Sequence, residues 1–194
     1  MCDCAASDRG RVGDELTKLQ IRHAKQADLE KMISFDHHSE GAYAYKLEVN
    51  KDKQSQTSTF QRVRLPRTVL VTYPKDEETM VKSWSKAESI LVGCLVDEPV
   101  AYVSLEGSSL PKTARISDLA VDKNLRQKGI ASSMLAASEA WARERKLGRL
   151  LIELQMRNDP AISLVKKSGF ELCGYLDRFF PNGDTALFFE KRLV

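Results

Sequence analysis

Apolar and polar positions follow two different periods in the second half of the chain. Short apolar runs bounded by turn-forming residues predict strands over residues 89–96, 100–107, 115–121 and 150–156. The first two strands flank a turn and are expected to form an antiparallel hairpin. Between the last two, apolar residues recur every three or four positions. This spacing predicts a helix that begins near Gly129 and ends at Gly148.

The chain beyond residue 156 is expected to add a second helix and a final pair of strands. Asp159 is placed to cap this helix, Pro160 suits its first turn, and Gly169 suits its end. The turn Pro181-Asn182-Gly183 predicts one strand on either side.

The first half of the chain has weaker patterns. Residues 1–18 show no period and are expected to form a flexible tail, while residues 19–22 and 24–35 predict a short strand and a short helix. The polar stretch 51–60 is expected to be a loop. Two alternating segments, 60–65 and 68–73, separated by Pro66, predict strands or a hairpin extension. Asp76 is placed to cap a helix over residues 77–84.

These elements predict an α+β fold with a mixed, mostly antiparallel central sheet and flanking helices, in one domain over residues 19–194. Hydrophobic residues make up 42% of the chain, enough for a sizeable core. In the strand at 115–121 the apolar positions change phase, from Ala114 and Ile116 to Leu119 and Val121. A slip of one residue is what a β-bulge produces.

Charge and cysteine content narrow the class of protein. Lys and Arg number 30 against 27 Asp and Glu, without a basic run, so nucleic acid is not an expected partner. Four cysteines in 194 residues do not suggest a disulfide framework, and no metal site is expected. There is neither a signal-peptide core nor an apolar run of membrane-spanning length. A cytoplasmic protein without membrane contact is therefore expected.

The segment from Arg126 to Ala131 joins a strand end to a helix start through a short loop. A helix N-terminus presents unpaired N–H groups and a partial positive charge, both of which suit a phosphate. Gly129 permits close approach to the backbone, and Lys123, Arg126 and Lys128 can add positive charge. The loop matches neither a Walker A motif nor a dinucleotide fingerprint. By itself it predicts an anion site at a strand–loop–helix junction, or an ordinary turn with surface charges.

The pattern Arg126-x-x-Gly129-x-Ala131 resembles the signature [R/Q]-x-x-G-x-[G/A] of the GNAT acyltransferases, which bind the pyrophosphate of acetyl-CoA. Asn158-x-x-Ala161, followed by Gly169-Phe170, looks like a second signature of that family. The resemblance covers roughly residues 90–194. It implies an acetyl-CoA-dependent N-acetyltransferase with a GNAT-like sheet, in which the bulged strand and its parallel neighbour separate around the pantetheine arm.

The resemblance also implies which residues hold the cofactor. Backbone groups of Leu119, Ala120 and Val121 would bind the pantetheine, and Asn158 would contact it. Ser132 and Ser133 could add hydroxyl donors. The remaining contacts are N–H groups toward the pyrophosphate, from Gln127, Lys128, Gly129, Ile130 and Ala131, beside the charge of Arg126.

The catalytic groups follow less directly, because two positions depart from the family pattern. The usual tyrosine acid is Val165, and the usual glutamate base falls on Arg115 or Ser117. Asp118 is the first candidate for base or amine binder, and Tyr175 is the nearest substitute acid. Either could instead be structural: Asp118 by shaping the bulge, Tyr175 as a core residue. The second choices for the base are Glu106 and Glu153.

Several residues could border the acceptor site, although solvation or core packing would explain them too. They are the pair His37-His38, the aromatic residues Tyr43, Tyr45, Phe179 and Phe180, and the basic residues Arg62, Arg64 and Arg67.

The expected reaction is direct attack of a primary amine on acetyl-CoA, without a covalent enzyme intermediate. The acceptor would be a small molecule or a peptide, and a homodimer is allowed. The stretch 116–170 looks somewhat like streptothricin and other small-amine acetyltransferases. Two alternatives stay open: a non-catalytic acyl-CoA-binding sensor, and an anion-binding scaffold unrelated to CoA.

Overall fold

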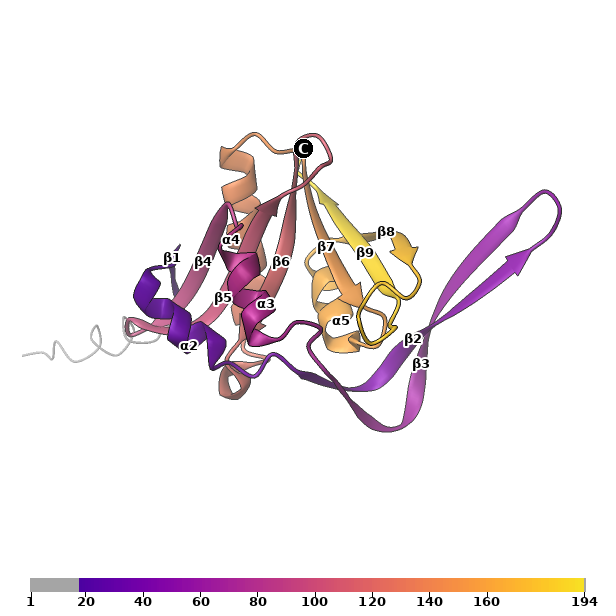
Figure 1. The fold of residues 1–194 in the computed structure, drawn as a ribbon, viewed down its shortest axis with the longest axis horizontal. Helices are drawn as coiled ribbons and strands as arrows, with labels where there is room; N and C mark the ends of the chain where they lie inside the picture. Colours follow the sequence, from indigo (N-terminus) through magenta and orange to yellow (C-terminus); the bar gives the residue numbers. More distant parts are fainter. Residues whose placement is uncertain (1–17, 194) are drawn as a thin grey trace, which may run out of the picture.

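The computed structural model describes residues 18–193, so the predicted tail lies almost entirely outside the described residues. The order of elements matches the α+β prediction from residue 76 onward (Figure 1). Before that point lie β1 (Gln20–His23), the 3-10 helix η1 (Gln26–Asp28), α2 (Leu29–Ile33), β2 (Ser39–Lys51) and β3 (Gln56–Val71). After it lie α3 (Glu77–Trp84), β4 (Ser89–Leu95), β5 (Glu98–Gly107), β6 (Thr113–Val121), η2 (Lys123–Leu125), α4 (Ile130–Glu144), β7 (Arg149–Gln155), α5 (Asp159–Lys167), β8 (Glu171–Leu176) and β9 (Ala186–Arg192).

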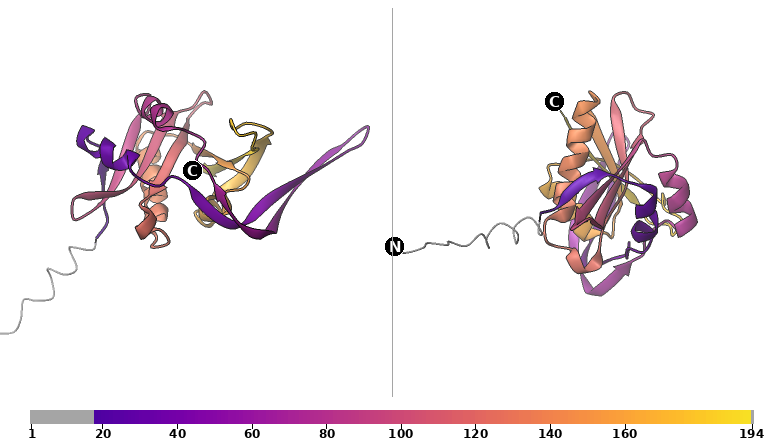
Figure 2. Two further views of the ribbon diagram at one scale, coloured as in Figure 1. Left: turned by 60° about the horizontal axis from the view of Figure 1, so that its bottom comes forward. Right: turned by 90° about the vertical axis from the view of Figure 1, so that its left-hand side faces the viewer.

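The central sheet has the order β1-β4-β5-β6-β7-β9-β8, and within it only β6 and β7 are parallel. Successive strand residues face opposite sides, so neighbours such as Ala101 and Tyr102 enter different cores. The core around Ala101 contains residues of α4 and α5, and the core around Tyr102 contains residues of α2 and α3. Helices therefore cover both faces of the sheet (Figures 1 and 2).

The predicted bulge in β6 is confirmed. Its register with β5 shifts between the pairs Ser104↔Asp118 and Leu105↔Ile116, which leaves Ser117 as the extra residue. On the other side, β6 pairs with β7 only over Thr113–Ile116. Both strands continue beyond that point without pairing to each other (Figure 1), and this unpaired region between their facing edges is the opening.

Strands β2 and β3 form a separate two-stranded ribbon, the arm, that projects from the body (Figures 1 and 2). Of the predicted loop over residues 51–60, only residues 52–55 form a loop, because the strands pair as far as Lys51↔Gln56. Of the two predictions for residues 60–73, the hairpin extension is confirmed and the two strands separated by Pro66 are not, because β3 continues through Pro66 to Val71. Between Gly41↔Val69 and Tyr43↔Arg64 the partners of β3 skip four residues, so Pro66 lies in a bulge that needs no ladder N–H.

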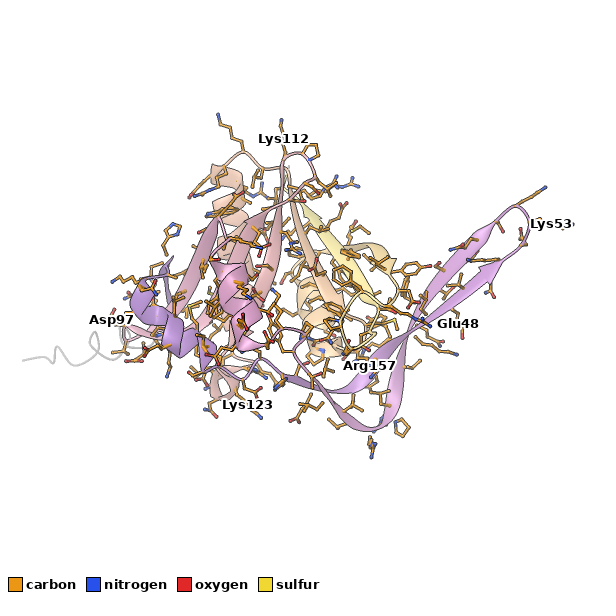
Figure 3. The ribbon with its side chains drawn as sticks, viewed as in Figure 1. Glu48, Lys53, Asp97, Lys112, Lys123 and Arg157 are labelled. Atoms are coloured by element: carbon orange, nitrogen blue, oxygen red, sulfur yellow. The ribbon has the colours of Figure 1, made fainter. Side chains whose placement is uncertain are left out.

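The base of the arm is attached to the body by specific contacts. The N–H of Tyr45 donates to the carbonyl of Met156 at 3.1 Å, and Arg62 pairs with Asp159 through two hydrogen bonds of 2.6 and 3.0 Å. Tyr45 also packs against the main core. Lys53, at the tip of the arm, lies clear of the body (Figure 3).

Two predicted helix ends need correction. Asn158, not Asp159, caps α5, because its side-chain oxygen accepts from the N–H of Ala161 at 3.2 Å. Helix α4 ends at Glu144, before Gly148, since Lys146 already takes the left-handed conformation with φ of 57°. The capping of α3 by Asp76 is confirmed by a bond of 2.8 Å from the N–H of Thr79.

Candidate functional site

The loop between β6 and α4 presents a row of free N–H groups. Gln127 and Gly129 take left-handed φ values of 63° and 83°, which turns successive N–H groups toward one side. Among the described residues, no acceptor is found for the N–H groups of residues 127–132, while that of Ser133 donates to the carbonyl of Gly129. A β-carbon built on Gly129 would meet no atom within 4 Å, so the space there is open. The loop is shaped as an anion site.

The charged side chains of the loop are not equivalent. Lys128 is exposed, and Lys123 reaches the carboxylate of Asp36 at 3.3 Å (Figure 3). The guanidinium of Arg126 instead donates to the protein's own carbonyls: to Val121 at 3.2 Å, to His38 at 2.9 Å, and to Asp36. Three donors of the side chain that was predicted to lie beside the anion therefore bind main-chain carbonyls.

The opening beside β6 exposes main-chain groups. Asp122 donates to Val100 on β5, and N–H and C=O groups of a strand alternate between its two neighbours. By this alternation, the main-chain groups of Ala120 face β5, and those of Leu119 and Val121 face the opening. Two of the three residues predicted to contact the pantetheine thus lie on the edge that has no strand partner, where the carbonyl of Val121 accepts from Arg126.

Asn158 stands at the start of α5, just after β7. Its side-chain oxygen accepts both the N–H of Ala161 and the hydroxyl of Ser39, the latter at 3.0 Å. The oxygen of Asn158 is thus used in hydrogen bonds within the protein. Its amide nitrogen is left for the predicted contact with a ligand.

Asp118 is buried on the α3 side of the sheet, and its side chain has an exposed fraction of 0%. It accepts hydrogen bonds from the hydroxyl of Tyr73, from the ammonium of Lys75 at 2.8 Å, and from Ser117 at 3.3 Å. Burial and the neighbouring carboxylate raise the pKa of Tyr73, so its hydroxyl stays protonated. Tyr73 and Lys75 were missed by sequence reasoning, because no spacing links them to Asp118.

The His37-His38 pair lies against this buried group. The Nε2 of His37 shares a hydrogen bond of 2.8 Å with the hydroxyl of Tyr102, and Nδ1 of His38 accepts the N–H of Tyr73 at 2.9 Å. Burial lowers the pKa of His37. The structure therefore brings the pair together with Asp118, through tyrosines that the sequence did not single out.

Arg115, in the position of the family's usual base, bridges the two second-choice carboxylates. It reaches Glu106 at 2.5 Å and Glu153 at 2.8 Å, and Ser83 also donates to Glu106. Burial opposes ionisation of Glu106, but the hydrogen bonds from Arg115 and Ser83 hold its pKa below the ordinary value. This cluster lies on β5, β6 and β7 at the point where the opening begins.

Tyr175 is not brought near Asp118. Strands β7 and β9 separate β6 from β8, and three strand spacings amount to about 14 Å. The hydroxyl of Tyr175 shares a bond of 3.0 Å with Ser58 of the arm, and its ring packs edge-on against Phe60. Val165, where the family has its tyrosine, is buried in the main core.

The predicted acceptor residues scatter over two regions. Arg62 stacks over Tyr43 at 3.7 Å, so these two side chains contact each other. Phe179 and Phe180, between β8 and β9, pack on each other. A hollow of about 700 Å³ lies between the arm and the body, lined by Tyr45, Leu47 and Met156 among others. Arg157, at its rim, lies where the arm passes the body (Figure 3). Arg64 and Arg67 line a second hollow on the arm.

Two further observations concern residues 18–193. No group of three His, Cys, Asp or Glu there could hold a metal ion. No helix in this range is both long and apolar enough to cross a membrane.

The sequence profile of the acetyltransferase (GNAT) family matches residues 57–170. A streptothricin acetyltransferase of Escherichia coli is 29% identical over 109 residues, which cover 54% of this chain and 63% of that protein. The chain spans between 52% and 63% of the length of the first curated relatives it matches.

Two solved structures share the fold. A nourseothricin acetyltransferase superposes with a TM-score of 0.78 at 20% identity, over 92% of this chain and 100% of that one. A Bacillus anthracis protein described as a streptothricin acetyltransferase, in complex with acetyl coenzyme A, gives 0.74 at 19% identity, over 91% and 99%.

Proposed function

The chain belongs to the acetyltransferase (GNAT) family of acetyl-CoA-dependent N-acetyltransferases, and on that premise we propose that it transfers an acetyl group from acetyl-CoA to a primary amine. One observation carries the proposal: the free N–H groups of residues 127–132 lie at the end of β6, beside the opening between β6 and β7. An anion site next to a free strand edge fits a ligand with a pyrophosphate and an amide-bearing arm.

The cofactor would be held mainly by main-chain groups. In this proposal the N–H groups of residues 127–132 bind the pyrophosphate, with Lys128 and Ser132 at the rim. The free edge of β6 at Leu119 and Val121 pairs with the pantetheine amides. Asn158 contacts the pantetheine from the opposite side through its amide nitrogen.

The acyl transfer would proceed by direct attack of the neutral amine on the thioester, without a covalent intermediate. A main-chain N–H on the free edge of β6 would stabilise the oxyanion. Asp118 is our candidate base. Because its carboxylate has no exposed surface and accepts a hydrogen bond from the hydroxyl of Tyr73, it would receive a proton through Tyr73, which takes up the amine proton as it passes its own to Asp118, or through a water. The role of Tyr175 as acid stays a prediction, which requires its hydroxyl to leave Ser58.

For the acceptor, we propose a small-molecule amine of the streptothricin class as the first to test. The similar proteins named above support this class, since they are named for streptothricin and nourseothricin. The hollow between the arm and the body lies beside Met156, directly after β7, and offers room near the end of the opening. A peptide N-terminus is the second acceptor to test.

The direct experiment compares the wild type with Gly129→Glu. Isothermal titration should show CoA binding to the wild type and none to the variant, because the new carboxylate faces the pyrophosphate in the space that is open at Gly129. Thiol release from acetyl-CoA, measured with nourseothricin and a panel of amines and peptides, should be amine-dependent in the wild type only. Equal CoA affinity of the two proteins would remove the cofactor assignment.

A second candidate function is an acyl-CoA-binding sensor without catalysis. Val165 is buried where the family has a tyrosine acid, and Arg115 is ion-paired where the family has a glutamate base. Tight CoA binding by the wild type without thiol release on any amine of the panel would favour the sensor.

A further inference from the structure

The guanidinium of Arg126 donates to three main-chain carbonyls in two other segments of the chain. Its Nε donates to Val121 at the end of β6, and its two terminal nitrogens donate to His38, at 2.9 Å, and to Asp36. Asp36 and His38 belong to the connection between α2 and β2, far away in the sequence. An ion pair between Lys123 and the carboxylate of Asp36, at 3.3 Å, also joins the loop to this connection. The loop that carries the free N–H groups thereby holds residues 36–38 in place.

Residues 36–38 in turn support the buried carboxylate. His37 bonds with the hydroxyl of Tyr102 on β5, and His38 accepts the N–H of Tyr73. The hydroxyl of Tyr73 donates to Asp118 at the bulge. Hydrogen bonds thus form a path from Arg126, through His38 and Tyr73, to Asp118, the group that the proposed reaction uses on the amine side.

We propose that Arg126 is a positioning residue of the amine side of the site, and that its side chain does not bind the pyrophosphate. It fixes residues 36–38, and through them Tyr73 and Asp118, while the N–H groups of the same loop bind the anion. The inference rests on the proposed function for the identity of the anion and the amine. The hold of Arg126 on residues 36–38 does not depend on it.

The planar guanidinium favours this role over a phosphate contact. Its donors point in fixed directions, and carbonyls from three different residues already occupy one donor on each nitrogen. Only two of its five donors are left for a phosphate, and both are on nitrogens that already donate to His38 or Asp36. Lys128 is exposed on the same loop and is free to supply the positive charge.

The test compares Arg126→Ala and Arg126→Lys with the matched control Lys128→Ala, which removes a charge from the same loop. Hydrogen–deuterium exchange should be about tenfold faster over residues 34–39 in Arg126→Ala, the effect of about one net hydrogen bond, and unchanged in the control. Titration of His37 by NMR should show its pKa rising toward the ordinary value in Arg126→Ala, since burial and the charge of Arg126 both lower it. A rise in Arg126→Lys as well, where the charge is kept, would report hydration of the ring. The charged groups near this ring are Asp36, Asp118 and Arg126.

The CoA affinity should separate the two sides. By isothermal titration, Arg126→Ala should change it less than about threefold, whereas Lys128→Ala should weaken it several-fold. Methylguanidinium added to Arg126→Ala should restore slow exchange over residues 34–39, which a general loss of packing would not allow. Arg126→Lys, which keeps the stem and charge, serves if the alanine variant does not fold.

Unchanged exchange and an unchanged His37 titration in both Arg126 variants would overturn the proposal. A large loss of CoA affinity in Arg126→Ala, matching that of Lys128→Ala, would also overturn it, because Arg126 would then be a pyrophosphate ligand. If the wild type itself does not bind CoA, the proposed function fails. Exchange and the His37 titration would then still decide whether Arg126 holds residues 36–38.

Discussion

Arg126 and Asn158, at the residue scale, use their side chains on the protein itself. The first donates to carbonyls of other segments, and the second caps α5 and accepts from Ser39. The groups left free in the same loop are main-chain N–H groups. Motif side chains therefore shape the backbone, and in the function we propose the backbone contacts the ligand. Substitution of Arg126 should therefore act on residues 36–38, and substitution of Asn158 on the start of α5.

Gly129 offers a test of that conformation. Its φ is 83°, and a β-carbon there would meet nothing within 4 Å, so Gly129→Ala adds backbone strain without a clash. The left-handed conformation costs a non-glycine residue about 1–2 kcal/mol. Calorimetry should show a Tm lower by roughly 2–8 °C, since 1 kcal/mol shifts a domain of this size by about 2–4 °C. Gly148→Ala, which is equally open and has no positive φ, should leave Tm unchanged. Equal losses in both variants would contradict the prediction.

His37 should make stability depend on pH near neutrality. Burial lowers its pKa in the folded state, so the unfolded chain binds the proton more readily. The stability that neutral His37 contributes is complete above the unfolded pKa of about 6.5, and is lost as pH falls toward the lower folded value. The Tm of the wild type should drop more between pH 7.5 and 5.5 than that of His37→Gln. Parallel pH profiles of the two proteins would show that His37 does not titrate in this way.

The elements from α3 to β9 were largely predictable from the sequence, whereas the arm was not. Burial imposes a period on β4 to β7, and the phase change around Ser117 showed the bulge before any coordinates. The arm is held by its own pairing and is solvated along most of its length. Its strands therefore need no regular alternation of apolar residues, and the polar stretch 51–60 has the composition of a loop.

The candidate site likewise has one part that could be predicted from the sequence and one part that could not. The anion loop lies in one continuous segment, so its spacing was visible in the sequence. The surroundings of Asp118 come from Tyr73 and Lys75, more than forty positions earlier, which the fold brings to the bulge. Such pairs depend on how the arm returns to α3, and no local pattern encodes that path.

The contact between Arg62 and Asp159 should determine how firmly the arm is attached. Asp159 is buried and receives both bonds from Arg62, so Arg62→Ala leaves a buried carboxylate without its cation. Hydrogen–deuterium exchange should become faster across residues 43–47 and 60–64, where the arm meets the body. Arg64→Ala is the matched control, since Arg64 lies on the same face of β3 and makes no ion pair within residues 18–193. Faster exchange in both variants would assign the effect to arm charge in general.

At the scale of the whole molecule, the central sheet separates two cores, and the proposed cofactor and amine groups lie on different sides of it. The free N–H groups start α4, whose apolar face packs in the larger core. The buried carboxylate faces Tyr73 and Lys75 beside α3. The bulge of β6 is where the two sides meet, and Arg126 links them from the loop.

This division predicts that CoA stabilises the molecule independently of the outer arm. A ligand that binds only the folded state at 100 times its Kd adds about 2.7 kcal/mol. For a domain of this size that amounts to a rise in Tm of roughly 5–11 °C. The wild type should show this rise and Gly129→Glu should not. A variant in which residues 48–59 are replaced by Asn-Gly should show it in full. Val49 of this segment lines the hollow and Ser58 bonds with Tyr175 of β8, and neither contact is on the loop that carries the free N–H groups. Loss of the shift in the shortened protein would place the arm on the cofactor side of the sheet, and a shift that persists while amine turnover falls would place it with the acceptor.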